Sequence, residues 1–366
     1  MIDRRLFTHF DWGLLALVLL IGGLGIVNIA SATASYHIIG TAYYVKQMYW
    51  IIAGMLLVVT FCSIDYHLLE DFSFWLYGVL VFMLLAVLIV GKSSMGATRW
   101  LSLGFISFQP SEPMKIIIIM AFASYFTRTP SLKGLGLRDL LYPFLIVAGP
   151  VLLIMKQPDL GTATLVFLIA SSMLMFVGIR LATFVSIILA TIPAFFLGWH
   201  VYLREYQKER ILNFLSPERD PLGSGYHIIQ SKIAVGSGGF LGKGFMQGTQ
   251  TQLHFLPEQH TDFAFSVFSE EWGFAGCLVV LLLYLCLIFW GLSVAKKCND
   301  SFGKLMAVGV TAMLFWHIVI NIGMVIGLFP VVGVPLPLFS YGGTSMITSM
   351  VGIAILLNIR MRRFMF

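Results

Sequence analysis

The chain has 366 residues, of which 58% are hydrophobic and only 11% are charged. Soluble domains carry about 25% charged residues, so the composition excludes a water-soluble fold and predicts an integral membrane protein. The formal net charge of +6 is concentrated in short loops between apolar runs. We therefore attribute this charge to membrane topology and anionic lipid, and we expect no nucleic acid as a partner.

Apolar runs long enough to cross a bilayer follow one another along the chain. A helix needs about 20 residues to span the hydrocarbon core. We predict about ten such helices, near residues 12–34, 45–63, 72–90, 110–127, 140–156, 162–179, 181–200, 263–294, 305–329 and 344–359. The expected fold is an all-α polytopic membrane protein, with residues 1–366 forming a single membrane domain.

The distribution of Lys and Arg predicts the orientation of these helices. If the N-terminus is inside, the cytoplasmic segments hold Arg4, Arg5, Arg128, Lys133, Arg138, Arg180, Lys296, Lys297, Lys304, Arg360, Arg362 and Arg363. The short outer loops then hold only Lys46, Lys92, Arg99 and Lys156. Because cytoplasmic loops carry an excess of basic residues, we predict that both termini are cytoplasmic.

Residues 201–261, between the seventh and eighth predicted spans, form a polar, glycine-rich extracytoplasmic loop. Loops of this length are usually functional. We expect a charged surface helix at 204–210 and a short amphipathic helix near 226–235. The pair Gly242-Lys243 invites comparison with a phosphate-binding P-loop, but Ser237 and Gly244 stand where that motif needs Gly and Ser or Thr. We expect a loop packed closely on the membrane domain; the alternative is a backbone cradle for another anion.

Five ionisable residues fall at the outer ends of predicted spans: Glu112, Lys115, Asp159, Asp262 and Glu270. A charge near the bilayer centre costs about 2.5–3.5 kcal/mol, so such residues mark either function or structural ion pairs. Glu112 and Lys115 are three residues apart and can pair on one helix face. Together these residues predict a polar cavity open to the outside. The alternative is that these residues form structural ion pairs. This alternative is weakest for Asp262, which lies where the outer loop meets a span.

The histidines give no sign of a metal site. His254 and His260 lie near a carboxylate, but no helix or strand period aligns them as ligands. His317, in the ninth predicted span, is expected to be a polar group in helix packing. The sequence therefore predicts no metal ligands.

The chain holds four motifs in this order: FQPSE at 108–112, QPDLGT at 157–162, HTDF at 260–263 and the run NIGMVIGLFPVVGVPLPLFSYGGTS at 321–345. These motifs resemble those of the SEDS family (shape, elongation, division and sporulation). The resemblance covers almost the whole chain. Segments 220–232 and 248–253 are most similar to the family members that act in cell elongation.

The resemblance implies a peptidoglycan glycosyltransferase that polymerises lipid II into glycan strands on the outer face of the bacterial cytoplasmic membrane. The donor would leave as a lipid-linked (undecaprenyl) diphosphate, which needs no protonation. One carboxylate would then suffice, unlike the pair that a glycosidase uses. On this basis Asp262 is expected to act as general base towards the incoming 4-hydroxyl.

The diphosphate charge must be offset by cations. The expected substrate-binding residues are Arg99, Glu112, Lys115, Asp159, Arg210 and Lys232, of which the four basic ones would face the diphosphate. A divalent cation such as Mg²⁺ is possible, since diphosphate often recruits it, but the sequence shows no dedicated cage.

The family also implies partners, namely a class B penicillin-binding protein (a transpeptidase) and other proteins of the elongation complex. Gly323 and Gly327 in the ninth span are small enough to allow close approach of a partner helix.

Two other functions stay open. A lipid II flippase would use the same polar cavity, although the charges lie towards one face, which favours chemistry over alternating access. A non-catalytic scaffold of the elongation machinery would need no buried carboxylate.

Overall fold

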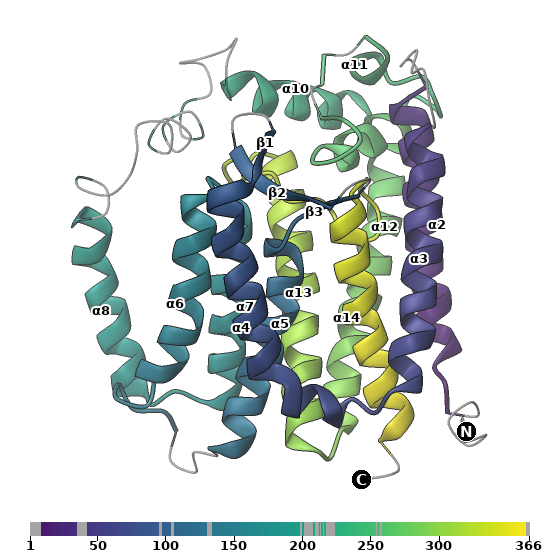
Figure 1. Cartoon of the computed structure of the whole chain (residues 1–366). Helices are drawn as coiled ribbons and strands as arrows, with labels where there is room; N and C mark the ends of the chain where they lie inside the picture. Colours follow the sequence, from purple (N-terminus) through teal and green to yellow (C-terminus); the bar gives the residue numbers. More distant parts are fainter. Residues whose placement is uncertain are drawn as a thin grey trace.

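The computed structural model describes residues 9–34, 42–94, 97–103, 106–129, 134–197, 224–253, 255–256 and 258–363, with five isolated positions between 200 and 216. Ten helices in this part of the chain run along a common axis (Figure 1). They are α2 (Trp12–Ala32), α3 (Tyr43–Ser63), α4 (His67–Val90), α5 (Ser111–Arg128), α6 (Leu141–Lys156), α7 (Leu160–Val177), α8 (Leu181–Leu197), α12 (Ala264–Lys297), α13 (Ser301–Val325) and α14 (Gly343–Arg362).

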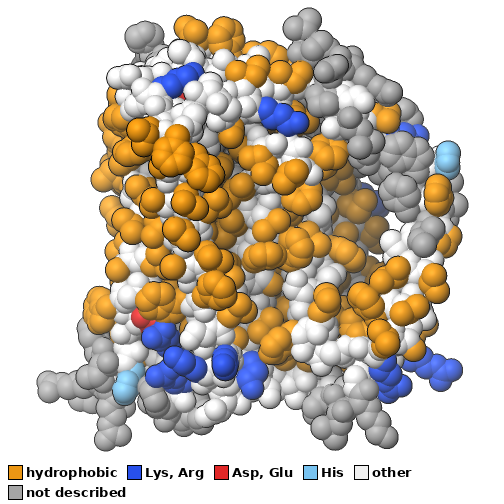
Figure 2. All heavy atoms as spheres, turned by 180° about the vertical axis from the view of Figure 1, so that it is seen from behind, with side chains coloured by type: hydrophobic (Ala, Val, Ile, Leu, Met, Phe, Trp, Pro, Cys, Tyr) orange, Lys and Arg blue, Asp and Glu red, His pale blue; other side chains and the backbone are white. Residues whose placement is uncertain are grey.

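These helices confirm the polytopic all-α fold, one for each predicted span. Seven of them are long and apolar enough to cross a membrane by themselves. The other three are α6 and α8, whose apolar parts are shorter, and α5, which carries Glu112 and Lys115. Hydrophobic side chains cover the middle of the surface (Figure 2), as expected where helices face lipid rather than water.

The ninth predicted span was too long at its C-terminal end. It was expected to reach residue 329, but α13 ends at Val325. Gly327 has a φ of 77°, in the left-handed region that ends helices, and Pro330 follows it. The chain then continues as an irregular segment over residues 326–342.

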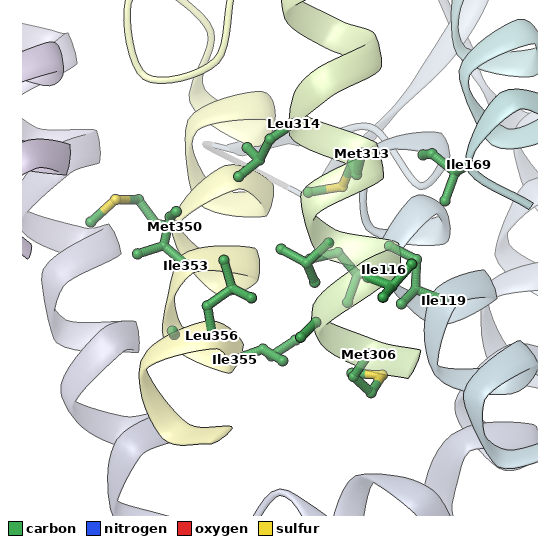
Figure 3. Close-up of a cluster of buried hydrophobic side chains, with 14 of the residues drawn as sticks. Ile116, Ile119, Ile169, Met306, Met313, Leu314, Met350, Ile353, Ile355 and Leu356 are labelled. Atoms are coloured by element: carbon green, nitrogen blue, oxygen red, sulfur yellow. The ribbon is translucent and has the colours of Figure 1, made fainter. Parts of the chain in front are cut away.

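The core of the bundle lies around α13, which packs against α5, α7, α12 and α14. Figure 3 shows the central cluster, with Ile116 and Ile119 from α5 facing Met313 and Leu314 from α13. A β-carbon at Gly309 of α13 would overlap the Ile119 side chain. This close approach holds α13 tightly against α5.

A polar layer covers the end of the bundle opposite the start of α2 and the end of α14 (Figure 1). It holds β1 (Lys92–Ser94), β2 (Ala97–Leu103), β3 (Ile106–Phe108), α10 (Ser224–Ser237) and α11 (Thr249–Gln252). The three strands form an antiparallel sheet in the order β1-β2-β3. Helix α10 confirms the amphipathic helix predicted near 226–235, whereas the charged helix predicted at 204–210 falls largely outside the described residues.

Helix α12 is broken at Gly273, whose φ is 63°. A break frees backbone groups, and here the glycine-rich loop bonds to them. Lys243 N donates to Glu270 O (3.0 Å) and Gly244 N to Glu271 O (3.0 Å), while Phe274 N donates to Gly239 O (2.9 Å) and Ala275 N to Phe240 O (3.0 Å). The predicted close packing of the loop is confirmed. The anion-cradle alternative is wrong, because the amides of residues 242–244 already donate to carbonyl oxygens.

Candidate active site

Asp262 lies in the polar layer, two residues before α12 begins. The turn that carries it is closed by two hydrogen bonds to the carbonyl of Glu258, from Thr261 N (3.1 Å) and Phe263 N (3.4 Å). Glu258 itself has a φ of 47°, an uncommon conformation for a residue with a side chain. The turn thus places the Asp262 side chain, which is partly exposed, at the end of the bundle that the polar layer covers.

The surroundings of Asp262 change its acidity. Burial raises the pKa of its carboxyl group, and the nearby charges of Glu258 and Asp159 raise it further, while that of Arg99 lowers it; together they bring the pKa to about 7. A group with a pKa near the working pH is well suited to accept and release a proton. The sequence pointed to Asp262, Asp159 and Arg99; the structure brings them together and adds Glu258.

Asp159 and Arg99 are fixed by contacts of their own. Asp159 caps α7, accepting hydrogen bonds from Thr162 N (3.3 Å) and Thr162 Oγ1 (3.0 Å), and also one from Gln109 Nε2 (3.1 Å). Arg99, on β2, donates to the carbonyl of Pro158 and has its Nη1 3.9 Å from Asp159 Oδ1. Asp159 therefore has a structural role as well as an electrostatic one, and Arg99 is a cation held beside the carboxylates.

Glu112 and Lys115 form the predicted pair, with Lys115 Nζ 2.8 Å from Glu112 Oε1. The pair extends to α13, because Lys115 Nζ also lies 2.8 Å from His317 Nε2. His317 Nδ1 donates to Met313 O (2.7 Å), so its Nε2 accepts from the ammonium group. Lys115 is only 1% exposed, and Glu112 Oε2 has no hydrogen-bond partner among the described residues. His317 is thus a polar packing group, as expected, with Lys115 as its partner.

One of the predicted basic residues, Lys232, is not brought to Asp262. Another, Arg210, lies outside the described residues. Lys232 projects from α10 onto Gly327, where an added β-carbon would overlap its Cε. Its ammonium group therefore lies near the C-terminal end of α13, where a cation is favourable, and Lys232 is not among the charges that shift the pKa of Asp262.

Glu270 fastens the glycine-rich loop upstream of α12 to that helix. Its carboxylate is fully buried and accepts from Lys243 Nζ (2.7 Å), Gln250 N (3.1 Å), Thr249 Oγ1 (3.2 Å) and Thr251 Oγ1 (3.3 Å). All four donors come from the loop upstream of α12. These contacts explain why the apolar helix α12 contains a charged residue, and the explanation requires no role for Glu270 in the reaction.

The two glycines predicted to face a partner helix, Gly323 and Gly327, are covered by side chains of this chain. A β-carbon at Gly323 would overlap the ring of Phe329, and one at Gly327 would overlap Lys232. The segment after α13 folds back over these glycines. A partner helix would therefore meet Phe329 and Lys232 instead of a glycine surface.

Sequence reasoning missed Glu258, and it assigned no role to Asn321 and Gly333 although both belong to the family motif. Asn321 Nδ2 donates to Asp262 O (2.9 Å), and a β-carbon at Gly333 would lie 3.3 Å from Asp262 Oδ2. Within the described residues no group of three or more His, Cys, Asp or Glu side chains could hold a metal ion.

Comparison with known proteins gives this arrangement its context. The family model for FtsW, RodA and SpoVE, described as "Cell cycle protein", matches residues 11–364. The chain belongs to this family. Peptidoglycan glycosyltransferase MrdB of Escherichia coli K12 is 44% identical over 318 residues, covering 85% of this chain and 84% of that protein. MrdB of Helicobacter pylori J99 is 38% identical over 100% of this chain and 93% of its own length.

Solved structures agree with the family assignment. A chain of a peptidoglycan synthase complex, described as coordinating polymerization and crosslinking, superimposes with a TM-score of 0.83 at 33% identity, covering 98% of this chain and 99% of that one. The rod shape determining protein RodA of Thermus thermophilus superimposes with a TM-score of 0.70 at 28% identity, covering 97% and 98%. The membrane fold of the family thus extends over nearly the whole chain.

Proposed function

We infer that this peptidoglycan glycosyltransferase polymerises lipid II into glycan strands during cell elongation, with Asp262 as its general base. The relatives' names support the activity. The role of Asp262 rests on one observation: this carboxyl group lies in the polar layer with a pKa of about 7, and it feels the charge of Arg99, which is held 3.9 Å from Asp159.

We propose a direct substitution at the donor sugar. Asp262 takes the proton of the acceptor's 4-hydroxyl as that oxygen bonds to the anomeric carbon of the donor. The bond from that carbon to the diphosphate breaks, and the lipid diphosphate leaves with the electron pair. It needs no acid catalyst, because diphosphate is a stable anion. Arg99, the cation whose charge lowers the pKa of Asp262, would offset the charge of the leaving group.

The remaining substrate-binding residues keep the roles that the sequence assigned to them, as proposals. Lys115 would meet the diphosphate by exchanging its contact with Glu112 or His317, and Lys232 and Arg210 would act from the outer loop. A divalent cation would be bound mainly by the oxygens of the diphosphate, which suits a hard cation that retains several waters.

We place the protein in the bacterial cytoplasmic membrane with both termini in the cytoplasm and residues 201–261 outside. Lys and Arg side chains gather on the rim opposite the polar layer (Figure 2), as the positive-inside rule requires. The structural similarity to a chain of a peptidoglycan synthase complex supports a class B penicillin-binding protein as partner.

The decisive experiment is polymerisation of lipid II by purified Asp262→Asn protein. The amide keeps the size of the side chain but cannot accept the proton, so the rate should fall about 10²–10⁴-fold. Asp300→Asn is the matched control: Asp300 also precedes a helix, accepting from Gly303 N (2.6 Å), but at the opposite end of the bundle. Asparagine caps helices equally well, so this variant should remain active.

Near-normal glycan chains from folded Asp262→Asn protein would overturn the assignment of the base. A flippase would move lipid II across vesicles and yield no polymer from either form. A scaffold would be indifferent to the substitution.

A further inference from the structure

The carboxylate of Asp262 is positioned through its backbone. Within the described residues, no group donates a hydrogen bond to its carboxylate oxygens. Asn321 donates a hydrogen bond to its main-chain carbonyl instead. A base must lie within hydrogen-bond reach of the proton that it removes. The residues that hold the main chain of Asp262 and limit the space around its side chain therefore determine the geometry of the reaction.

Asn321 holds the peptide. It lies in α13, fully buried, and its amide nitrogen donates to Asp262 O (2.9 Å) and to Val334 O (2.7 Å). A side-chain amide has two hydrogens to donate, and here both are used. One side chain on the rigid central helix thus joins the turn of Asp262 to the irregular segment after α13.

Gly333 bounds the space around the carboxylate. Its φ of 68° favours glycine, and an added β-carbon would lie 3.3 Å from Asp262 Oδ2. The same segment is pressed against α7 from the other side, because a β-carbon at Gly161 would overlap Val332 O. Residues 332–334 therefore form a wall between the start of α7 and the Asp262 side chain, and the bond from Asn321 to Val334 fixes that wall.

We propose that Asn321 and Gly333 are positioning residues of the glycosyl transfer, Asn321 by anchoring the Asp262 peptide and Gly333 by leaving room for its carboxylate. This rests on the proposed function of Asp262 as the base. Neither residue touches the reacting atoms. Their substitution should therefore lower kcat and leave KM nearly unchanged.

The chain supplies a matched control in Asn358. It is likewise buried and donates its amide hydrogens to two carbonyls, Phe61 O (2.7 Å) and Ile64 O (2.8 Å), at the opposite end of the bundle. Asn321→Ala should reduce kcat about 10–100-fold, since a misplacement of about 1 Å costs on the order of 10²-fold. Asn358→Ala should lower the melting temperature comparably, but leave kcat per folded molecule within about twofold.

Gly333→Ala provides a second variant that keeps every hydrogen bond of Asn321. Its methyl group should crowd the carboxylate, lower kcat and move the acid limb of the pH–rate profile, which a change in folding alone would not move. If Asn321→Ala does not fold, this variant carries the test.

Different results would refute the assignment of Asp262 as the base and the positioning role of Asn321 and Gly333. If Asp262→Asn remains active, the assignment of the base is wrong. If Asp262→Asn is inactive, but Asn321→Ala behaves like Asn358→Ala and Gly333→Ala keeps the wild-type kcat and pH profile, Asp262 is the base and the positioning role is refuted.

Discussion

The buried pair of Glu112 and Lys115 allows structural pairing to be separated from substrate binding. The pair is 2.8 Å long, and its side chains are 6% and 1% exposed. Lys115→Met fills the same volume but leaves the Glu112 carboxylate without its cation. Removing one partner of a buried pair costs about 3–5 kcal/mol, whereas replacing both by neutral groups is often nearly neutral. The double variant Glu112→Gln/Lys115→Met should therefore recover most of the lost stability.

Stability and polymerisation of lipid II are measured on the same four proteins of this cycle. Because the double variant should recover most of the roughly 3–5 kcal/mol lost in Lys115→Met, the two single substitutions should be coupled by about 3 kcal/mol or more. If Lys115 also binds the diphosphate, the double variant should be stable and inactive, and this is the result we expect. Recovery of both stability and activity would leave Lys115 with a structural role only. A Lys115→Met protein as stable as the wild type, or a double variant less stable than either single variant, would refute the reasoning about the buried pair.

Three further predictions follow from the polar layer. The kcat/KM should rise as pH increases through the Asp262 pKa, near 7. Glu258→Gln removes a nearby anion and should therefore move this rise in kcat/KM to lower pH. Movement to higher pH would contradict the electrostatic effect of Glu258 on Asp262. Glu270→Gln removes the charge that binds the outer loop, so protease should cut the loop faster while polymerisation falls less than in Asp262→Asn; unchanged cleavage rates would exclude this role. In a protein without native cysteines, Gly236→Cys, which has open space around it, should react with an impermeant thiol reagent from outside and Lys297→Cys should not; the reverse pattern would invert the topology.

The membrane helices could be predicted well because one physical quantity decides them, the length of apolar chain that spans the hydrocarbon core. The second span was expected at 45–63 and is found as Tyr43–Ser63. The sheet formed by β1, β2 and β3 was missed, since strands of only three to seven residues, separated by two residues each, carry no clear alternation. The end of α13 was also misjudged, because the run after Val325 stays apolar although its backbone has left the helix.

The candidate site was predictable where a charge stands in an apolar setting. Asp262, Asp159 and the pair of Glu112 and Lys115 are conspicuous for this reason, and helical spacing gives the pair. Glu258 is not, because a carboxylate in a polar loop is ordinary. The contact of Asn321 with Asp262 joins residues 59 positions apart, and only the fold brings them together.

The joint at Gly273 is made largely by the main chain. Four bonds across it join backbone N–H to backbone C=O, and Gly238, Gly242 and Gly273 meet the opposing backbone where a β-carbon would overlap it. The exposed side chains between them, Phe240 and Leu241, make none of these bonds. Evolution can therefore vary the chemistry displayed at this corner while the number of residues between the glycines stays constant. An alignment here is best judged by spacing, because insertion of a single residue would disrupt the joint more than several substitutions.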